Sequence, residues 1–165
     1  MATKDISNLK DLFMHQLQMI FYAEQQLQKM IPHMTKKISD ASLKSAAEHH
    51  LKETQSQIKR LEQVFEAMGK KPEAATCPTM DGLIKEGEDV LSTVTDEHLC
   101  DAAVIAAMQA VEHHEITTYG TMIAWARQLG RKEVVKLLEE TLQEEKSMDK
   151  KLTDMAISKI NRMAA

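Results

Sequence analysis

The stretch VEHHEITTYGT, residues 111–121, places acidic side chains where a packed helix is normally apolar. It belongs to a stripe whose members recur every three or four residues, which is the spacing of one helix face. The stripe comprises Ala102, Ile105, Gln109, Glu112, Ile116, Tyr119 and Ile123. Glu112 is therefore predicted to face the interior, with Glu115 one turn further along the same side. Since a buried carboxylate without a partner costs several kcal/mol, we expect cations beside these acids.

The composition predicts a single all-α domain over residues 1–165. Hydrophobic residues make up 43% of the chain, which is enough for one buried core at this length. Only five glycines and three prolines are present, and aromatic residues make up 4%. The chain is rich instead in Ala, Leu, Met, Glu, Gln and Lys, which are strong helix formers.

Charge and hydropathy exclude several classes of function. No apolar run approaches the ~20 residues needed to cross a bilayer, and the N-terminal MATKDISNLK has no apolar segment of the signal-peptide type. A net charge of −4 without blocks of one sign gives no basic face for nucleic acid. Cys77 and Cys100 lack metal-ligand spacing and are interpreted as reduced thiols. We therefore expect a cytoplasmic protein without a membrane or nucleic-acid partner.

Apolar periodicity predicts four long helices, at about 5–38, 41–68, 97–129 and 132–159. Asp5 or Ser7 could cap the first helix, and Pro32 is expected to bend it or to end it a turn early. Residues 69–79 are predicted to form a loop, followed by a short helix at about 80–91. These two segments make a crossover long enough to span a bundle, so we expect an antiparallel four-helix bundle whose crossover carries a short extra helix.

Each predicted long helix carries at least one acid on its inward face, about halfway along. These acids are Glu24, Glu53, Glu112 with Glu115, and Glu145, and His50 also lies on the inward face of the second helix. For any single helix, an ordinary solvated acid on a misjudged face is a fair alternative. Four acids at one level favour a shared role instead. Inward carboxylates from four helices build two-metal sites in bundle proteins, and hard oxygen ligands suit iron or manganese.

Several longer motifs resemble the YciE/YciF family of ferritin-like bacterial stress proteins, and the resemblance covers nearly the whole chain. The motifs are AEQQL around Glu24, HLKET at 50–54, MDGLIKEG at 80–87, DAAVIAAMQAVEHHEITTYGT at 101–121 and TLQEEKSMDKKLTDMA at 141–156. The resemblance implies a ferritin-like four-helix bundle, similar in site design to rubrerythrin. It also implies a homodimer, a di-iron centre and ferroxidase activity.

By motif matching, the resemblance implies the metal ligands Glu24, His50, Glu53, Glu112, Glu115 and Glu145. The chain departs from the usual pattern, in which two of the helices carry Glu-x-x-His. It has His50-x-x-Glu53 on the second helix and Glu145-x-x-Met148 on the last. The missing histidines predict weaker metal binding.

A second departure concerns the surroundings of Glu24. Members of the family often have Asp and Tyr where this chain has Met19 and Phe21. Groups that hydrogen-bond the ligands can change metal affinity by about one or two orders of magnitude. The apolar replacements therefore predict a lower affinity for Fe(II) and slow turnover.

The function we expect is the oxidation of Fe(II) by oxygen or peroxide at a di-iron site. Glu53 and Glu145 are expected to bridge or chelate the metals, with the other acids as terminal ligands. Tyr119 is a candidate redox neighbour or hydrogen-bond donor, although a core tyrosine is an equally fair interpretation. A dimanganese enzyme that disproportionates peroxide would use the same ligands. A non-catalytic helical dimer of the stress response is the alternative from another class.

Overall fold

The computed structural model describes residues 5–165, which form helices and no strand. The helices are α1 (Leu9–Thr35), α2 (Ala41–Ala67), α3 (Pro78–Thr93), α4 (Glu97–Gln128) and α5 (Lys132–Met155). A π-helical turn, Ala156–Ile160, joins α5 to the short α6 (Asn161–Ala164). The all-α prediction is confirmed, while residues 1–4 of the predicted domain lie outside the described residues.

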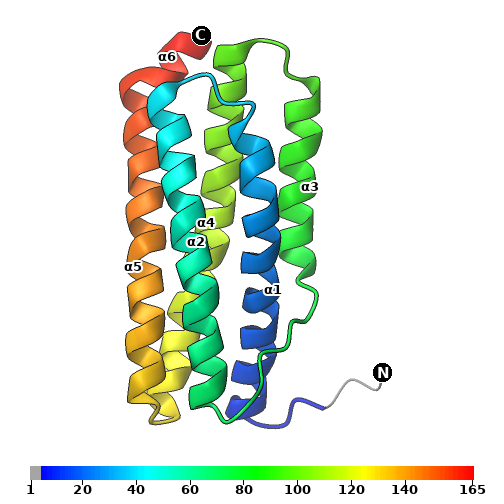
Figure 1. Cartoon of the computed structure of the whole chain (residues 1–165), viewed down its shortest axis with the longest axis vertical. Coiled ribbons are helices and arrows are strands. Elements are labelled where there is room, and N and C mark those ends of the chain that lie inside the picture. The colour runs from blue at the N-terminus through cyan, green and yellow to red at the C-terminus, as the bar shows by residue number, and fades with distance from the viewer. Residues whose placement is uncertain (1–4) are drawn as a thin grey trace.

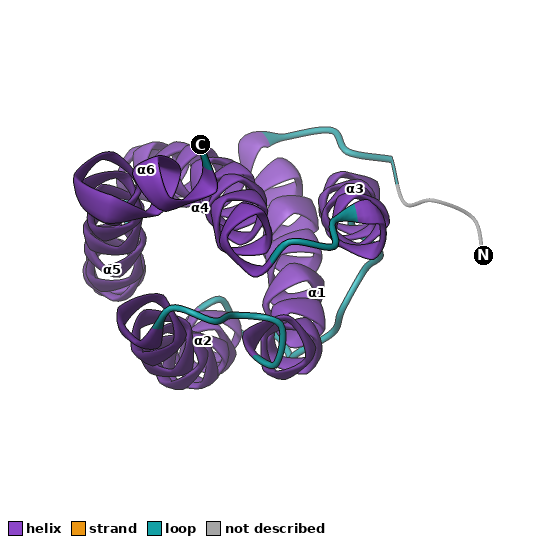
Figure 2. Ribbon diagram, turned by 90° about the horizontal axis from the view of Figure 1, so that it is seen from above, coloured by secondary structure: helices purple, strands orange, loops and turns teal. Residues whose placement is uncertain are grey.

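Four helices, α1, α2, α4 and α5, run along a common axis (Figure 1). Viewed along that axis, α1 is followed around the bundle by α2, α5 and α4, and α3 lies outside the ring (Figure 2). α3 packs mainly on α4 and also touches α1. The segment from α2 to α4 carries the chain from one end of the bundle to the other (Figure 1). The predicted four-helix bundle with a long crossover is confirmed.

The first helix begins at Leu9, later than expected from Asp5 or Ser7. Asn8 is the residue that caps it, because its side-chain oxygen accepts a hydrogen bond from the Asp11 N–H at 3.0 Å. Pro32 lies inside the last turn, and α1 ends at Thr35. A proline so near the end interrupts little of the helical hydrogen bonding, because few residues follow it in the helix.

Glycines end α2 and α4 in the same way. Gly69 and Gly130 have φ values of +71° and +68°, which lie in the left-handed region that glycine tolerates best. After α2, the Gly69 N–H donates to the Glu66 carbonyl at 2.8 Å and the Lys70 N–H donates to the Phe65 carbonyl at 2.9 Å. This pair of bonds is the Schellman ending, so α2 stops where the sequence places its glycine.

Two apolar clusters fill the core. The first, cluster A, includes Phe13, Leu17, Leu61, Phe65, Met122 and Leu138. The second, cluster B, includes Met34, Leu43, Val104, Leu152 and Ile160. On α2, α4 and α5, buried polar residues separate the members of the two clusters. The interior therefore has a polar layer between two apolar ones.

Asp101, a buried acid of α4, holds the connection between α1 and α2 against α4 through hydrogen bonds. Asp101 is only 1% exposed, and its carboxylate accepts hydrogen bonds from the Ser39 N–H at 2.8 Å and from the Ser39 hydroxyl at 2.6 Å. It accepts a third from the Asp40 N–H at 2.9 Å. Asp40 in turn caps α2, since its side chain accepts from the Ser42 and Leu43 N–H groups. Asp101 therefore has a structural role, because Ser39 and Asp40 of the same chain supply the hydrogen bonds that its carboxylate accepts.

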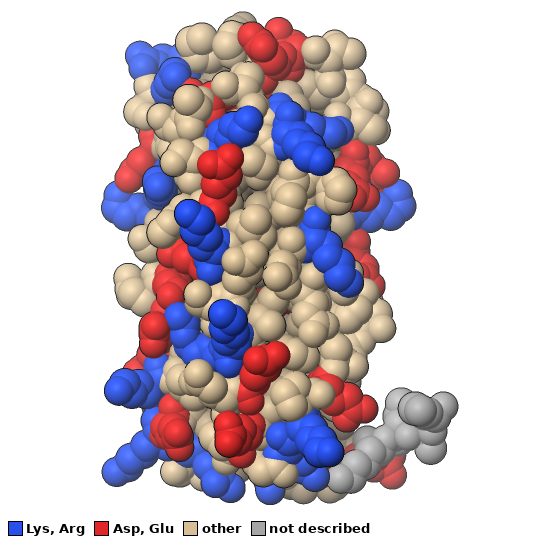
Figure 3. Space-filling model, in the orientation of Figure 1, with Lys and Arg blue, Asp and Glu red and all other residues tan. Residues whose placement is uncertain are grey.

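The surface in Figure 3 mixes Lys and Arg with Asp and Glu and shows no large block of one sign. Within residues 5–165, no helix is both long enough and apolar enough to span a bilayer.

Candidate metal centre

Four buried side chains meet in the polar layer between the two apolar clusters. His50 comes from α2, Glu112 and Glu115 from α4, and Glu145 from α5. Each can offer a ligand atom such that all four atoms lie within 4.8 Å of one another. Glu24 of α1 adjoins this group, and its carboxyl interacts with those of Glu115 and Glu145. The structure therefore brings together five of the six candidate ligands.

The helix pattern of α4 explains why two of these acids converge. Glu112 and Glu115 are both fully buried, and they are spaced like neighbouring residues on one helix face. Met108 precedes them on the inward side, and Tyr119 and Met122 follow. The face that carries the acids is therefore the same face that packs into the core.

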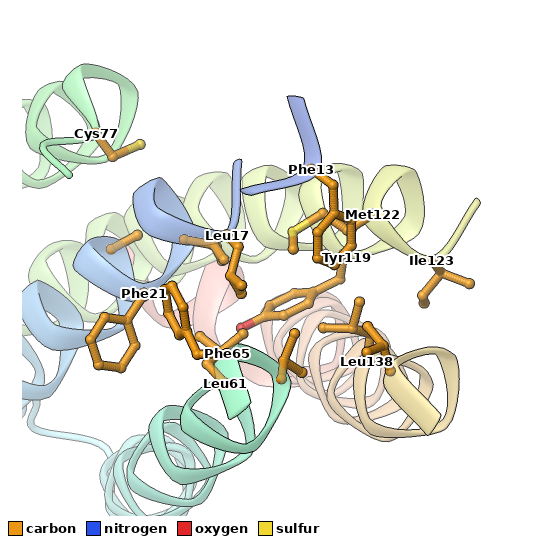
Figure 4. Close-up of a cluster of buried hydrophobic side chains, with 14 of the residues drawn as sticks. Phe13, Leu17, Phe21, Leu61, Phe65, Cys77, Tyr119, Met122, Ile123 and Leu138 are labelled. Carbon is orange, nitrogen blue, oxygen red and sulfur yellow. The ribbon is translucent and has the colours of Figure 1, made fainter. Parts of the chain in front are cut away.

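Tyr119 contacts the centre through Glu24. Its hydroxyl donates to Oε1 of Glu24 at 2.5 Å, and both side chains are fully buried. Figure 4 shows the Tyr119 ring among Phe13, Leu17 and Leu138 of cluster A. The aromatic ring thus packs in the apolar layer while the hydroxyl orients an acid of the polar layer.

Three carboxyls of the centre, those of Glu24, Glu112 and Glu115, have pKa values raised above the usual range. Burial, reinforced by the charge of Glu145, raises the pKa of Glu24 from 4.5 to about 8. Burial and then the neighbouring acids raise the pKa values of Glu112 and Glu115 well above the usual range. Burial also raises the pKa of Tyr119. Without a cation, Glu24 therefore holds its proton near neutral pH, and the pKa values of Glu112 and Glu115 are shifted in the same direction.

Many polar atoms of this layer make no hydrogen bond. Within residues 5–165, the buried and unpaired side-chain atoms are Oε2 of Glu24, Nδ1 of His50, Oγ1 of Thr54, Oε1 of Gln57, both oxygens of Glu112 and Glu115, and Oε2 of Glu145. Nε2 of His50 lies 3.3 Å from Oε1 of Glu112 but does not hydrogen-bond to it. Since proteins pair most buried polar atoms, such a concentration calls for a ligand. Carboxylate oxygens with one imidazole fit iron or manganese.

Glu53 is the candidate ligand that lies apart. Its side chain is 22% exposed, with Oε1 at 3.2 Å from Nε2 of His49 and Oε2 at 3.8 Å from Nδ1 of His50. Burial alone would raise the pKa of Glu53, but the imidazoles of His50 and His49 outweigh it and lower the pKa. Glu53 therefore sits at the rim of the layer, next to a ligand candidate rather than among the ligands.

Two polar residues of α2 lie inside the layer where sequence reasoning did not place a site. Thr54 and Gln57 are both fully buried. Nε2 of Gln57 donates to Oε2 of Glu144 at 2.9 Å and also to Oε1 of Glu145. The signal was present, because both residues share the helix face of His50. Neither residue is a usual iron ligand, so the pattern alone gave no reason to select them.

The surroundings of Glu24 on α1 are apolar, as the sequence suggested. Phe21 is buried and packs edge-to-face on Phe65 with ring centroids 5.4 Å apart. Met19 is partly buried against cluster A. Tyr119, from α4, is the residue that donates to Glu24.

A second polar cluster lies where α3 meets α1 and α4. Sγ of Cys77 is 3.8 Å from Nε2 of His114, and the Tyr22 hydroxyl donates to Oδ1 of Asp81 at 3.0 Å. Burial lowers the pKa of His114. Both cysteines are free thiols, as expected, and Cys77 is only 1% exposed. The start of α3 is thereby tied to both neighbouring helices.

A protein family described as a domain of unknown function, DUF892, matches residues 8–165. The chain belongs to this family. The chain is also similar to Protein YciF of Escherichia coli strain K12, with 41% identity over 161 residues, which is 97% of this chain and 97% of YciF. The resemblance to the YciE/YciF family is therefore confirmed.

Solved structures agree with this membership of the DUF892 family. YcfI of Rhodopseudomonas palustris, named as a proposed structural protein, has a TM-score of 0.90 and 44% identity, covering 93% of this chain and 98% of YcfI. The crystal structure of the E. coli stress protein YciF also has a TM-score of 0.90, with 41% identity over 94% of this chain and 99% of YciF. A protein of Xanthomonas campestris pv. campestris has a TM-score of 0.72 and 25% identity, and the match covers 90% of this chain and 91% of that protein.

Proposed function

We propose that the protein binds two iron ions in its polar layer and oxidises Fe(II) with oxygen or peroxide. The observation that supports this proposal is the set of buried, unpaired oxygen and nitrogen atoms on residues that can all act as ligands. The acids come from α1, α4 and α5, and the imidazole comes from α2. This donor set is rich in hard anionic oxygens, which favour the ferric product.

The side chains take different roles in this proposal. Glu145 adjoins both the His50–Glu112 side and the Glu24 side of the layer, so its carboxylate would help to hold both cations. Glu112 and Glu115 bind as further carboxylates, and His50 contributes one nitrogen. Glu53 lies at the rim, with Oε2 at 3.8 Å from Nδ1 of His50, and would add a further carboxylate to the bound cations. The chemistry that bound iron supplies is one-electron transfer to the oxidant.

Tyr119 keeps Glu24 oriented during such a reaction. The Tyr119 hydroxyl donates a hydrogen bond to Oε1 of Glu24, so Oε2 is the oxygen of that carboxylate that has no hydrogen-bond partner. The closely packed rings around Tyr119 hold the hydroxyl in place and exclude water from that side. Protons that the raised pKa values keep on the acids must leave when cations bind, so metal uptake releases protons.

Stopped-flow absorbance of the ferric product tests the proposal. We expect oxidation of Fe(II) above the uncatalysed rate, and a strong decrease in Glu145→Ala. Glu53→Ala should also decrease the rate, and Glu62→Ala, an exposed acid on the same helix α2, serves as the control. Equal rates in the wild type and in Glu145→Ala at matched iron loading would contradict catalysis and favour a non-catalytic helical protein.

The identity of the metal needs a separate measurement. A dimanganese centre that disproportionates peroxide would use the same oxygen-rich ligands. Elemental analysis of protein purified without chelator, expressed as ions per chain, distinguishes iron from manganese. Manganese at about two ions per chain together with oxygen release from peroxide would replace the ferroxidase proposal.

We also infer a homodimer that uses the outer face of α4. From Ala102 to Ala126 the charged residues of this helix are Glu112 and Glu115, and both are buried. The exposed side therefore presents small and uncharged groups, such as Ala106 and Ala110, beside a shallow groove of about 180 Å³ between α3 and α4. Although Glu86 of α3 lines the groove, the small apolar side chains of α4 favour contact with a second apolar surface.

Sedimentation velocity tests the dimer. Ala106→Glu should yield monomers, because it would bury a charge in the interface. Gln55→Glu adds the same charge on the exposed side of α2 and should leave the dimer intact. A wild-type protein that sediments as a monomer at all concentrations would refute the dimer.

A further inference from the structure

One helix of the bundle differs from the others in what it contributes to the polar layer. α1, α4 and α5 each direct carboxylates inward, namely Glu24, the Glu112–Glu115 pair and Glu145. The buried polar residues of α2 are His50, Thr54 and Gln57, none of which is an acid. The negative charge of the layer is therefore distributed unevenly among the four helices.

The orientation of the Gln57 amide is set by its neighbours. Its Nε2 donates to carboxylate oxygens of both Glu144 and Glu145, and an amide oxygen would be repelled at that position. Oε1 must then lie on the other side of the amide, where it is buried and has no hydrogen-bond partner. Gln57 thus offers one neutral oxygen to the interior while holding Glu145 with its nitrogen.

Arg60, one turn further along α2, makes this arrangement rigid. Its guanidinium donates to both oxygens of Glu144, at 3.0 and 2.9 Å, and to the Thr141 hydroxyl at 2.7 Å. It also donates to Glu140 at 2.9 Å. Glu144 is held in a bidentate pair, which fixes the planar groups relative to each other. Gln57 is therefore held between a fixed acid at the surface and Glu145 in the layer.

The layer contains one complete set of ligands for a single cation. His50, Glu112, Glu115 and Glu145 can place one atom each within 4.8 Å of all the others. A second cation must rely on Glu24, whose Oε1 is already bonded to Tyr119, and must share Glu115 and Glu145 with the first. On the α2 side, the Gln57 amide offers it no charge. Both positions then have three carboxylates, but the second lacks the imidazole of His50 and has one oxygen of Glu24 bonded to Tyr119. A cation with fewer free donor atoms binds more weakly.

Resting on the proposed function of the layer as a metal site, we propose that Gln57 makes the two cation positions unequal. It positions Glu145 for the first cation, which binds to His50, Glu112, Glu115 and Glu145. At the second position it leaves a neutral amide in place of an anionic ligand. The first ion binds tightly and stays, and the second binds weakly and exchanges with solution.

Titration with Mn(II) tests this asymmetry without any turnover. Calorimetry gives the affinities, and electron paramagnetic resonance counts the free ion. In the wild type we expect the second Mn(II) to bind at least about tenfold more weakly than the first, because it has fewer free donor atoms. Two ions of equal affinity would overturn the proposal while leaving the metal site itself in place.

Two substitutions separate the roles of the amide. Gln57→Glu supplies a carboxylate and should strengthen the second binding event by roughly tenfold, while its loss of the donor to Glu145 should weaken the first event as Gln57→Leu does. Gln57→Leu removes the donor to Glu145 and should weaken the first event by about tenfold to one-hundredfold, as loss of a ligand-orienting group does. Gln55→Glu, which is exposed on the same helix, adds an equal charge and should change neither event.

The outcomes distinguish this inference from the proposed function. Unequal binding in the wild type with an unchanged second affinity in Gln57→Glu would overturn the role of Gln57. So would a first affinity in Gln57→Leu equal to that of the wild type. Absence of Mn(II) and Fe(II) binding in the wild type would instead overturn the metal site, and the asymmetry with it.

Discussion

Asp101 and Glu112 are two buried acids on the same helix, α4, and they are satisfied in opposite ways. The carboxylate of Asp101 accepts three hydrogen bonds from Ser39 and Asp40. Neither oxygen of Glu112 has a hydrogen-bond partner, and its neighbours are other acids and His50. Within residues 5–165, the chain supplies hydrogen-bond donors to the first acid and none to the second. Burial of an acid is therefore not evidence for a ligand until its partners are known.

The largest effect expected from this comparison is on the structural acid. Asp101→Ala should lower the free energy of unfolding by about 3 kcal/mol or more, because it leaves donors of Ser39 and Asp40 unpaired. The loss should be the same with and without Mn(II). Urea denaturation measures it, with the exposed Asp89→Ala as a control of similar chemistry. A loss that metal reversed would place Asp101 in the metal site instead.

Replacement of Glu112, whose oxygens have no hydrogen-bond partner, should affect stability differently from replacement of Asp101. Saturating Mn(II), at about one hundred times its dissociation constant, should stabilise the wild type by about 2.7 kcal/mol. Glu112→Ala should abolish most of this gain, yet be neutral or stabilising in the metal-free protein, because it removes repulsion between acids. Thermal unfolding with and without Mn(II) measures both. A variant destabilised equally in the two conditions would show that Glu112 has a structural role like that of Asp101.

The pH dependence of the metal-free protein sharpens the same contrast. The pKa of Glu24 is about 8 in the folded protein and 4.5 by its ordinary value, so above pH 4.5 the folded state binds the proton more strongly. Stability from this group is complete below pH 4.5 and is lost as the pH rises toward 8. Between pH 6 and pH 8 the loss should be about 2 kcal/mol for one proton.

Denaturation of chelator-treated protein at the two pH values measures this loss. Glu24→Gln should flatten the profile, because the amide does not titrate. A wild-type stability that rose between pH 6 and pH 8 would show that the carboxyl of Glu24 is ionised in the folded state. Saturation with Mn(II) should reverse the trend, because cations bind the deprotonated acids and so bind better at higher pH.

The smallest effect should come from the hydrogen bond that Glu24 does possess. Tyr119→Phe keeps the ring in cluster A and removes the hydroxyl that donates to Glu24. We expect a loss of about 1 kcal/mol in the metal-free protein and faster exchange of bound Mn(II). Tyr22→Phe, which removes a hydroxyl bonded to Asp81 outside the layer, is the matched control. Identical metal exchange in the two variants would assign Tyr119 to the core alone.

Helical periodicity was sufficient to predict that Glu24, Glu112, Glu115 and Glu145 face inward, because these acids lie within long regular stripes. It was not sufficient for Glu53, which is at the edge of its stripe. A small rotation of α2 decides whether such a residue lies inside or at the rim. His50, four residues before Thr54 on the inward face, was predictable for the same reason as the acids.

Contacts between helices were beyond the reach of sequence reasoning. The hydrogen bonds from Gln57 to Glu145 and from Tyr119 to Glu24 join residues far apart in the chain. Their existence depends on how the helices are rotated and shifted against one another, which local patterns do not specify. The role of Asp101 was missed for this reason too, since its partners lie on the connection between α1 and α2.

The opening of the crossover helix α3 can be followed through a cysteine that the chain already contains. Cys77 stands at the start of α3, is 1% exposed, and can meet a thiol reagent only when that end of α3 lifts from His114 and Tyr22. Cys100, 8% exposed in the first turn of α4, is covered by a different part of the molecule. The labelling rates of these two native thiols therefore report separate opening events. If α3 detaches while the bundle stays closed, Cys77 will be labelled first. Its labelling rate then measures how often α3 detaches, without an added probe.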